Sequence, residues 1–283
     1  MSSIRRHVSA LIDGKPRRSL TYAGNGYAVD ETGKPYHIES LDQREARRRV
    51  MAQQGKGRDR TFFWNRMVGL PYVAEVLTFA QSGYLLILSS HVNYDGLLVN
   101  NENDKSPMTT DDMRKALRLE KKRSTFYDFL DACMNYGIIS EVDGRFYVAQ
   151  HFHFRGKTEG DRVVKTYITM LRRMYKEVSA HDIGLLYRML PYINVETNIL
   201  CANPEEKDTK HIRKFNRKQL AEAVGVSPAV ISRATSRMIF NGKSVFAVIK
   251  TATDGTFYML NPDIFERKQL EYDPSIKAIF GLD

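Results

Sequence analysis

The stretch Ala221-Glu222-Ala223-Val224-Gly225-Val226-Ser227-Pro228-Ala229-Val230-Ile231-Ser232-Arg233 predicts two helices joined by a tight turn. Asn216 precedes the first helix and can cap it with its side chain. Gly225 permits the backbone that a sharp turn needs. Ser227 can cap the second helix, and Pro228 stands at its first position, where a missing N–H costs nothing. Cap, turn and helix start therefore all favour a helix-turn-helix.

The second helix has one apolar face and one polar face. Val230, Ile231, Ala234 and Met238 point one way, by their helical spacing. The opposite face carries small hydroxyls and arginines and no acidic residue, and such a helix suits the major groove of DNA. The expected DNA contacts are Ser227, Ala229, Ser232, Arg233, Ser236 and Arg237. An ordinary helical hairpin with a solvated face is the alternative.

Two expected strands follow the helix pair. Residues 245–249 and 256–260 are rich in β-forming side chains and flank the turn signal Thr253-Asp254-Gly255. Helix, turn, helix and β-hairpin in this order predict a winged helix. We expect Lys243 and Lys250 to flank the hairpin and to contact DNA.

An upstream part of the chain repeats the same order of elements. Residues 83–88 match 184–189, residues 92–98 match 193–200, residues 108–117 match 215–224, and residues 143–148 match 254–259. Self-similarity at a long period indicates a repeated folding unit. The chain is therefore predicted to contain two winged helices in tandem.

The predicted fold class is mainly α with small β-hairpins, an α+β fold of two tandem winged-helix domains behind a basic N-terminal extension. The expected domains are a basic arm over residues 1–68, winged helices over 69–157 and 158–270, and a C-terminal tail over 271–283. A chain of 283 residues with 42% hydrophobic content is long enough for two modest cores. A helix joining the two domains is predicted by a helical stripe of Val163, Tyr167, Leu171 and Met174.

We expect the upstream copy to bind DNA less well than the C-terminal copy. Its second helix, near residues 124–136, carries Asp128 and Asp131 toward its outer face, and carboxylates are repelled by phosphates. The helix start could still hold phosphates through Lys121, Lys122, Arg123 and Thr125. The alternative interpretation is that these cations form a charged stretch that only faces solvent. This copy could instead form a dimer or serve a partner protein.

The net charge of +10 indicates a polyanionic partner. The first sixty residues are basic and glycine-bearing, and we expect a partly disordered arm whose arginines, Arg47 and Arg48 among them, add phosphate contacts without sequence preference.

Cys133 and Cys201 lie in apolar contexts, which favours buried reduced thiols and a reducing cytoplasm. No stretch reaches transmembrane length, and no signal peptide is expected, so we expect a cytoplasmic protein with no membrane partner.

Two further motifs have competing interpretations. Residues 61–67 mix aromatics with a cation and either dock the arm onto a core or, less often, stack bases. His151 and His153 resemble the metal-binding motif of rolling-circle replication endonucleases, since alternation would put both imidazoles on one face. Those enzymes also need a helical tyrosine with a lysine one turn on, which neither Tyr167 nor Tyr175 supplies. We therefore expect no catalytic residue, metal or cofactor, and histidines that face solvent or phosphate.

Several motifs in residues 183–267 carry a family resemblance. They are Leu190-Pro191-Tyr192-Ile193-Asn194, Asn203-Pro204, the helix pair over 223–233, and Phe257-Tyr258-Met259-Leu260-Asn261-Pro262. In these motifs the segment resembles the winged-helix part of replication proteins from Gram-positive plasmids and phages, and the tandem order resembles two-winged-helix initiators of iteron plasmids. The resemblance implies a replication initiator that binds double-stranded origin DNA and recruits a host replication protein. A transcription regulator is the first alternative, because repressors use the same fold, and a phage protein that binds a host protein is the second.

Overall fold

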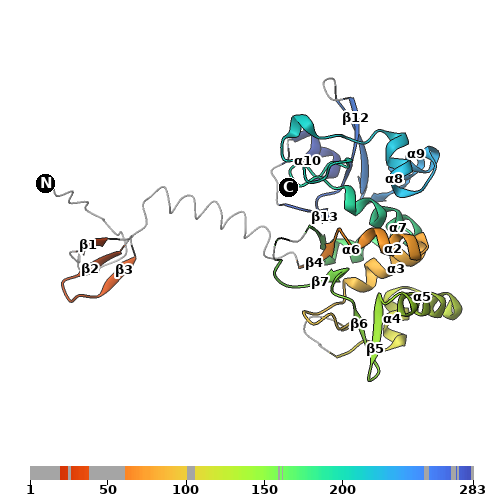
Figure 1. Cartoon of the computed structure of the whole chain (residues 1–283), viewed down its shortest axis with the longest axis horizontal. Coiled ribbons are helices and arrows are strands. Elements are labelled where there is room, and N and C mark those ends of the chain that lie inside the picture. The colour runs from red at the N-terminus through yellow and green to blue at the C-terminus, as the bar shows by residue number, and fades with distance from the viewer. Residues whose placement is uncertain are drawn as a thin grey trace. The chain divides into compact units, whose positions relative to one another are not determined.

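The computed structural model describes residues 20–24, 27–37, 61–100, 106–158, 160, 162–251, 255–268, 272 and 274–281. The chain divides into two compact units, Met1–Asp59 and Arg60–Asp283 (Figure 1). Arg47 and Arg48, which were expected to contact phosphates, lie outside the described residues.

The described part of the first unit is a three-stranded antiparallel sheet. Its strands are β1 (Leu20–Gly24), β2 (Tyr27–Asp30) and β3 (Pro35–His37), in the order β1-β2-β3. Asp30 fixes the turn between β2 and β3, because its Oδ1 accepts from the backbone N–H groups of Thr32 at 2.9 Å and Lys34 at 3.1 Å. Residues 20–24 and 27–37, expected within a basic arm, thus form a sheet.

The second unit is built around a four-stranded antiparallel sheet of order β13-β8-β4-β7. Its strands are β4 (Phe62–Arg66), β7 (His153–Phe154), β8 (Val163–Tyr167) and β13 (Phe265–Glu266). Phe63 pairs with Thr166, about a hundred residues away in sequence, and both side chains are fully buried. The sheet therefore joins segments from both ends of the unit.

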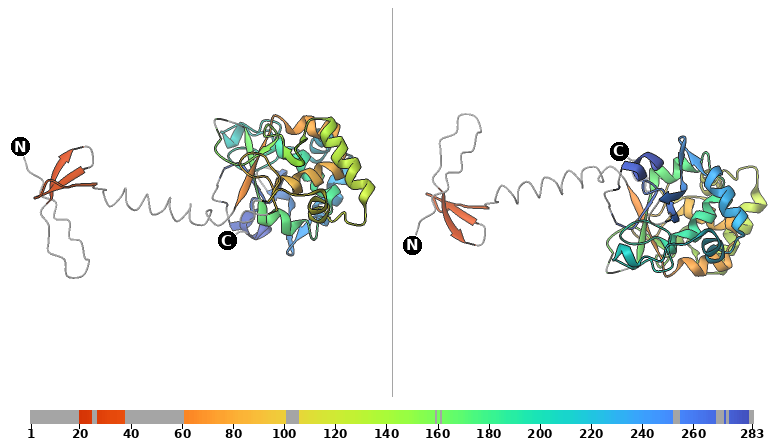
Figure 2. Two further views of the ribbon diagram at one scale, coloured as in Figure 1. Left: turned by 90° about the horizontal axis from the view of Figure 1, so that it is seen from below. Right: turned by 90° about the horizontal axis from the view of Figure 1, so that it is seen from above.

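Helices and two hairpins lie beside this sheet (Figures 1 and 2). The helices are α2 (Leu70–Val76), α3 (Phe79–Ser89), α4 (Thr110–Ala116), α5 (Arg123–Asn135), α6 (Ile168–Met174), α7 (Ala180–Met189), α8 (Arg217–Val224), α9 (Pro228–Arg237) and α10 (Pro274–Phe280), with short 3-10 turns at Leu190–Tyr192 and Thr209–His211. The hairpins are β5 (Ile139–Val142) with β6 (Arg145–Val148), and β11 (Phe246–Thr251) with β12 (Gly255–Leu260). The short strands β9 (Ile239–Phe240) and β10 (Lys243–Ser244) pair with each other.

Helices α3 and α7 cross at the centre of the unit, and two glycines permit the approach. A Cβ on Gly184 would lie 1.7 Å from the carbonyl oxygen of Phe79, and a Cβ on Gly83 would lie 1.9 Å from that of Ala180. Because backbone atoms occupy both places, only glycine fits at either position.

The sequence repeat is visible in equivalent loops and caps. Asn93 accepts from the backbone of the loop that follows it, at Asp95 N and Leu97 N, and Asn194 does the same at Glu196 N and Thr197 N. The caps are also equivalent: Thr78 and Thr109 cap α3 and α4, while Ser179 and Asn216 cap α7 and α8. Local hydrogen bonding therefore follows the repeat.

The expected fold class is nevertheless wrong. The structure is mixed α/β with several antiparallel sheets, not a mainly helical pair of winged-helix domains. Residues 62–66, read as a docking cluster, are strand β4, and residues 163–167, read as the start of a linker helix, are strand β8. Val163 and its neighbour Val164 are both buried, as in a strand covered on both faces, and the helix begins only at Ile168.

The repeat also has a different register in the hairpins. Leu97 bridges Tyr147, and its equivalent Ile199 bridges Met259, so Tyr147 corresponds to Met259 rather than to Tyr258. A shift of one residue turns each side chain to the other face of a strand. Met259 accordingly packs in a second core cluster with Phe280 of α10.

Candidate nucleic-acid interface

Local sequence signals place α9 on the surface of the second unit. Asn216 and Gln219 form a capping box at the start of α8, with Asn216 Oδ1 accepting from Gln219 N at 3.0 Å. Gly225 ends α8 with φ of +73°, the left-handed conformation that the turn requires. Ile231 and Ala234 anchor α9 in the core. The predicted pair of helices is thus confirmed, but Ser227 precedes α9 without making the expected side-chain cap.

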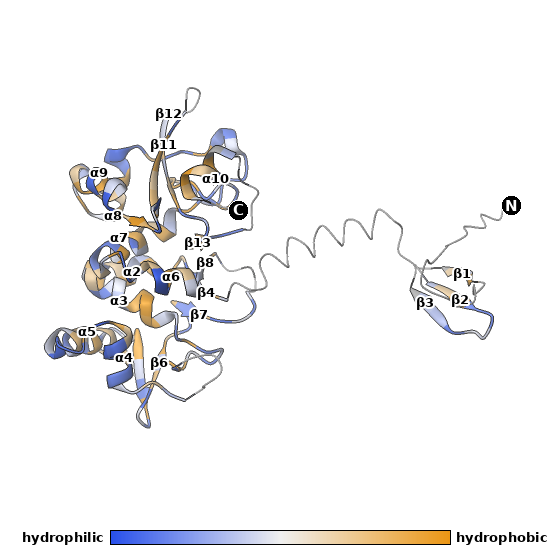
Figure 3. Ribbon diagram, turned by 180° about the vertical axis from the view of Figure 1, so that it is seen from behind, coloured by the Kyte–Doolittle hydropathy of each residue, from blue (hydrophilic) through white to orange (hydrophobic). Residues whose placement is uncertain are grey.

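The outward face of α9 is polar and carries no carboxylate. The predicted contact residues Ser227, Ala229, Ser232, Arg233 and Ser236 are all exposed, and none of the ten residues of α9 is acidic. In Figure 3 the ribbon of α9 mixes hydrophilic and hydrophobic residues, as in an amphipathic helix. This face can accept an anionic partner without charge repulsion.

Arg217, which is not among the predicted contact residues, joins this face. It is exposed at the start of α8, and its Nη1 donates to Ser232 Oγ at 3.0 Å. Burial raises the pKa of Tyr258 on β12, and the positive charge of Arg217 opposes that rise. Arg217 therefore contacts α9 and lies near enough to β12 for its charge to act on Tyr258. Its partner Ser232 is fifteen residues away, so no local sequence signal marks it.

The hairpin adds Lys250 on the same side. Lys250 pairs with Thr256 across β11 and β12, and both are exposed. Alternation along β11 puts Lys250 on the face of Val248, which pairs with Tyr258, while Ile249 faces α10 in the second core cluster. Lys250 thus shares the hairpin face that Arg217 adjoins.

Arg237 and Lys243 are engaged within the protein. Arg237 Nε donates to Asp182 Oδ2 at 3.0 Å, and its Nη2 donates to Asp182 Oδ1. This hydrogen bonding raises the pKa of Arg237, and the Asp182 side chain is only 8% exposed. Lys243 Nζ donates to the backbone oxygen of Gly281, next to α10. Both cations therefore hold elements together.

The start of α5 is a second basic region. Lys121, Lys122, Arg123 and Thr125 are all exposed there, and the guanidinium of Arg123 lies 5.4 Å from the ring centre of Tyr127. Asp128 and Asp131 are exposed further along the same helix. In Figure 1, α5 and α9 lie along one edge of the unit, toward opposite ends. The mixed charge of α5 makes it the less favourable face for DNA.

The two histidines of the possible metal motif are separated. His153 is fully buried, with Nδ1 at 3.0 Å from Asn65 Oδ1 and Nε2 at 3.1 Å from the hydroxyl of Tyr187. The Asn65 amide donates to Val164 O and Thr166 Oγ1, so its Oδ1 accepts from His153 and the Tyr187 hydroxyl donates to Nε2. Burial lowers the pKa of His153 to about 3.

His151 is exposed, as expected. The expectation that both imidazoles face solvent or phosphate is wrong for His153, because its side chain is buried. His151, two residues before β7, and His153, its first residue, thus lie in different environments. Within the described ranges, no group of three His, Cys, Asp or Glu side chains could hold a metal ion.

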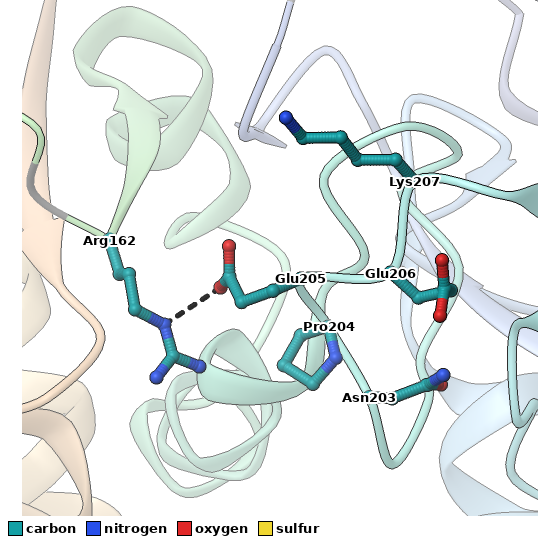
Figure 4. A pocket seen from close by; sticks show the side chains of 6 residues that line it. All are labelled: Arg162, Asn203, Pro204, Glu205, Glu206 and Lys207. Carbon is teal, nitrogen blue, oxygen red and sulfur yellow. Dashed lines mark hydrogen bonds and ion pairs between the residues drawn. The ribbon is translucent and has the colours of Figure 1, made fainter.

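A surface pocket lies between β8 and the loop that contains Pro204 (Figure 4). It is lined by Arg162, Asn203, Pro204, Glu205, Glu206 and Lys207. Glu205 forms ion pairs there, with its Oε1 at 2.8 Å from Arg162 Nε and at 2.9 Å from Arg267 Nη1. Burial would raise the pKa of Glu205, but the hydrogen bonds from Arg267 and Arg162 outweigh it and lower the pKa. The pocket therefore holds an internal ion network.

Comparison with known proteins returns no match to a protein-family model, a curated protein or a solved structure. In the described part of the chain, the helices lack the length and apolar character that crossing a membrane requires. The resemblance to plasmid and phage replication proteins therefore rests on the sequence motifs alone.

Proposed function

We propose that the protein binds double-stranded DNA with the exposed face of α9 in the major groove. The observation that carries this proposal is the exposed, acid-free face of α9, extended by Arg217 and Lys250. The major groove admits one α-helix, and a single exposed arginine can pair with both acceptors of guanine. This is a binding function and needs no catalytic residue.

Each residue of this face has a distinct expected role. Arg233 is the candidate base reader, because it is exposed at the middle of α9. Ser232, held by Arg217, is less free to reach a base. Arg217 and Lys250 would neutralise phosphates beside the groove, which strengthens binding without reading sequence.

We infer from the family resemblance that this binding starts replication of a plasmid or phage, in the cytoplasm and associated with the nucleoid or plasmid. Transcription regulation is the alternative, and the position of the binding site separates the two. An initiator binds repeats beside an AT-rich tract near its own gene, whereas a repressor binds an operator over a promoter. Footprinting on the native replicon would show which arrangement is present.

The α9 assignment is tested by selecting duplex sites from a random pool and measuring affinity for the selected site. Arg233→Ala is expected to weaken binding by about 1–3 kcal/mol and to relax the preference at one base pair. Arg145→Ala, which removes an exposed cation from the upstream hairpin, serves as the matched control. Unchanged affinity and preference in Arg233→Ala would reject the assignment.

A further inference from the structure

The sheet of the first unit exposes aromatic side chains. Among its described residues Ala28 is fully buried, whereas Tyr22 is 67% exposed, Tyr27 48% and Leu20 41%. Exposed aromatic side chains on so small a sheet are candidates for a binding surface.

The strand register sorts these side chains onto two faces. Tyr22 pairs with Ala28 across β1 and β2, and Ala28 pairs with Tyr36 across β2 and β3. Side chains directly opposite one another lie on one face of a sheet, and neighbours along a strand lie on opposite faces. Tyr22, Ala28 and Tyr36 therefore form one row, here called the tyrosine row, and Tyr27 lies on the other face.

One ring of the tyrosine row is held in place beside a cation. The hydroxyl of Tyr36 donates to Asp30 Oδ2 at 2.9 Å. Asp30 also accepts from the hydroxyl and amide of Thr32 and from the amide of Lys34, and these bonds, that from the Thr32 hydroxyl above all, lower its pKa to about 2. Lys34 Nζ lies 6.0 Å from the ring centre of Tyr36. The β2–β3 turn thus holds the ring of Tyr36 and brings the Lys34 ammonium near it.

The charge of this unit favours a polyanionic partner. Residues 1–59 contain twelve Lys and Arg residues and seven Asp and Glu residues, a net charge of +5, which is half of the +10 of the whole chain. Aromatic rings next to positive charge are the elements that bind single-stranded nucleic acid, because unpaired bases offer free faces for stacking. Bases inside a duplex are already stacked on their neighbours.

We propose that the tyrosine row binds single-stranded DNA, with bases stacked on Tyr22 and Tyr36 and phosphates near Lys34. This site is separate from the duplex-binding face of α9 and does not depend on it. A protein with both sites would hold a duplex and an opened strand at once.

The test measures fluorescence anisotropy of a labelled 20-mer of thymidylate, and of a duplex of equal length, with the full chain. Tyr22→Ala is expected to weaken oligothymidylate binding about tenfold, because stacking on one ring is lost. Tyr22→Phe, which keeps the ring, is expected to bind within about twofold of the wild type. Tyr27→Ala removes a similarly exposed tyrosine from the opposite face of the same sheet and is expected to have no effect.

Three results would overturn the tyrosine row as a binding site for single strands. They are undetectable oligothymidylate binding by the wild type, equal losses in Tyr22→Ala and Tyr27→Ala, and a loss in Tyr22→Phe as large as in Tyr22→Ala. Tighter binding of oligouridylate than of oligothymidylate would reject DNA as the partner. Duplex binding should be unchanged in the Tyr22 variants, so failure of this proposal is distinct from failure of the α9 assignment, which Arg233→Ala tests.

Discussion

Asp182 on α7 and Arg237 on α9 form a two-point ion pair in which the carboxylate is 8% exposed and the guanidinium side chain 49% exposed. The pair fixes the end of α9 against the start of α7, which itself crosses α3. Arg233, one turn earlier on α9, is exposed. Two arginines of one helix therefore have different roles.

Arg237→Ala is expected to lower the free energy of unfolding by about 1.5–3 kcal/mol, because the buried carboxylate of Asp182 loses its charged hydrogen-bond donor. Arg233→Ala should change it by less than about 0.5 kcal/mol, as is usual for an exposed surface residue. Urea denaturation of both variants gives the comparison. Equal stabilities would show that the ion pair does not hold α9.

Asp182→Asn is expected to free Arg237 for phosphate contact. Duplex affinity at low salt should then rise, and the slope of log affinity against log salt should steepen by about one. Anisotropy titrations at several salt concentrations measure this slope. The double variant Asp182→Asn with Arg237→Ala is the control, and a steeper slope that persists in it would assign the effect to the lost carboxylate alone.

Gly184→Ala is expected to destabilise the protein by more than about 3 kcal/mol, because the new methyl group meets the backbone of Phe79. In an ordinary helix the same substitution stabilises by about 1 kcal/mol. Gly144→Ala is the control: its φ is +72° but no atom lies within 4 Å of the added Cβ, so only the conformational cost of about 1–2 kcal/mol applies. Thermal unfolding that ranks Gly144→Ala as the worse variant would contradict the close crossing of α3 and α7.

Stability is expected to fall on acidification below about pH 6.5, the usual pKa of histidine. Burial lowers the pKa of His153 to about 3, and burial together with the charge of Arg172 lowers that of His91 to about 4. The unfolded chain therefore binds protons between pH 6.5 and those values while the folded chain does not. Each histidine contributes a loss of about 1.4 kcal/mol per pH unit across that window.

Urea midpoints at pH 7.5, 6 and 5 check this dependence. His153→Gln removes one titrating group and should reduce the slope by one proton, whatever it does to stability at pH 7.5. A slope equal to that of the wild type would exclude His153 as one of the two groups.

Local signals were sufficient to predict α8 and α9. Asn216, Gly225 and Pro228 each act on the backbone within a few residues, and the structure has the predicted cap, left-handed turn and helix start. The central sheet has no such signal. Pairing of Phe63 with Thr166 depends on segments about a hundred residues apart, and Val163 and Tyr167, four residues apart, fit a helical stripe equally well.

The candidate site divides in the same way. Exposure of Ser232, Arg233 and Ser236 followed from helical periodicity and is confirmed. The engagement of Arg237 depends on Asp182, fifty-five residues away in sequence, and only tertiary packing brings them together. Periodicity predicts which face of a helix a side chain lies on, but it does not predict which residues from other elements contact that side chain.

The crossing of α3 and α7 is reciprocal: the carbonyl of Phe79 faces Gly184, and the carbonyl of Ala180, which stands in the same place in the second copy, faces Gly83. Isologous contacts between identical subunits have this arrangement, in which each partner supplies both the protrusion and the recess. Here one chain supplies both partners. The two copies therefore cannot change independently at this point. A residue larger than glycine at either position requires the backbone of the other helix to move away.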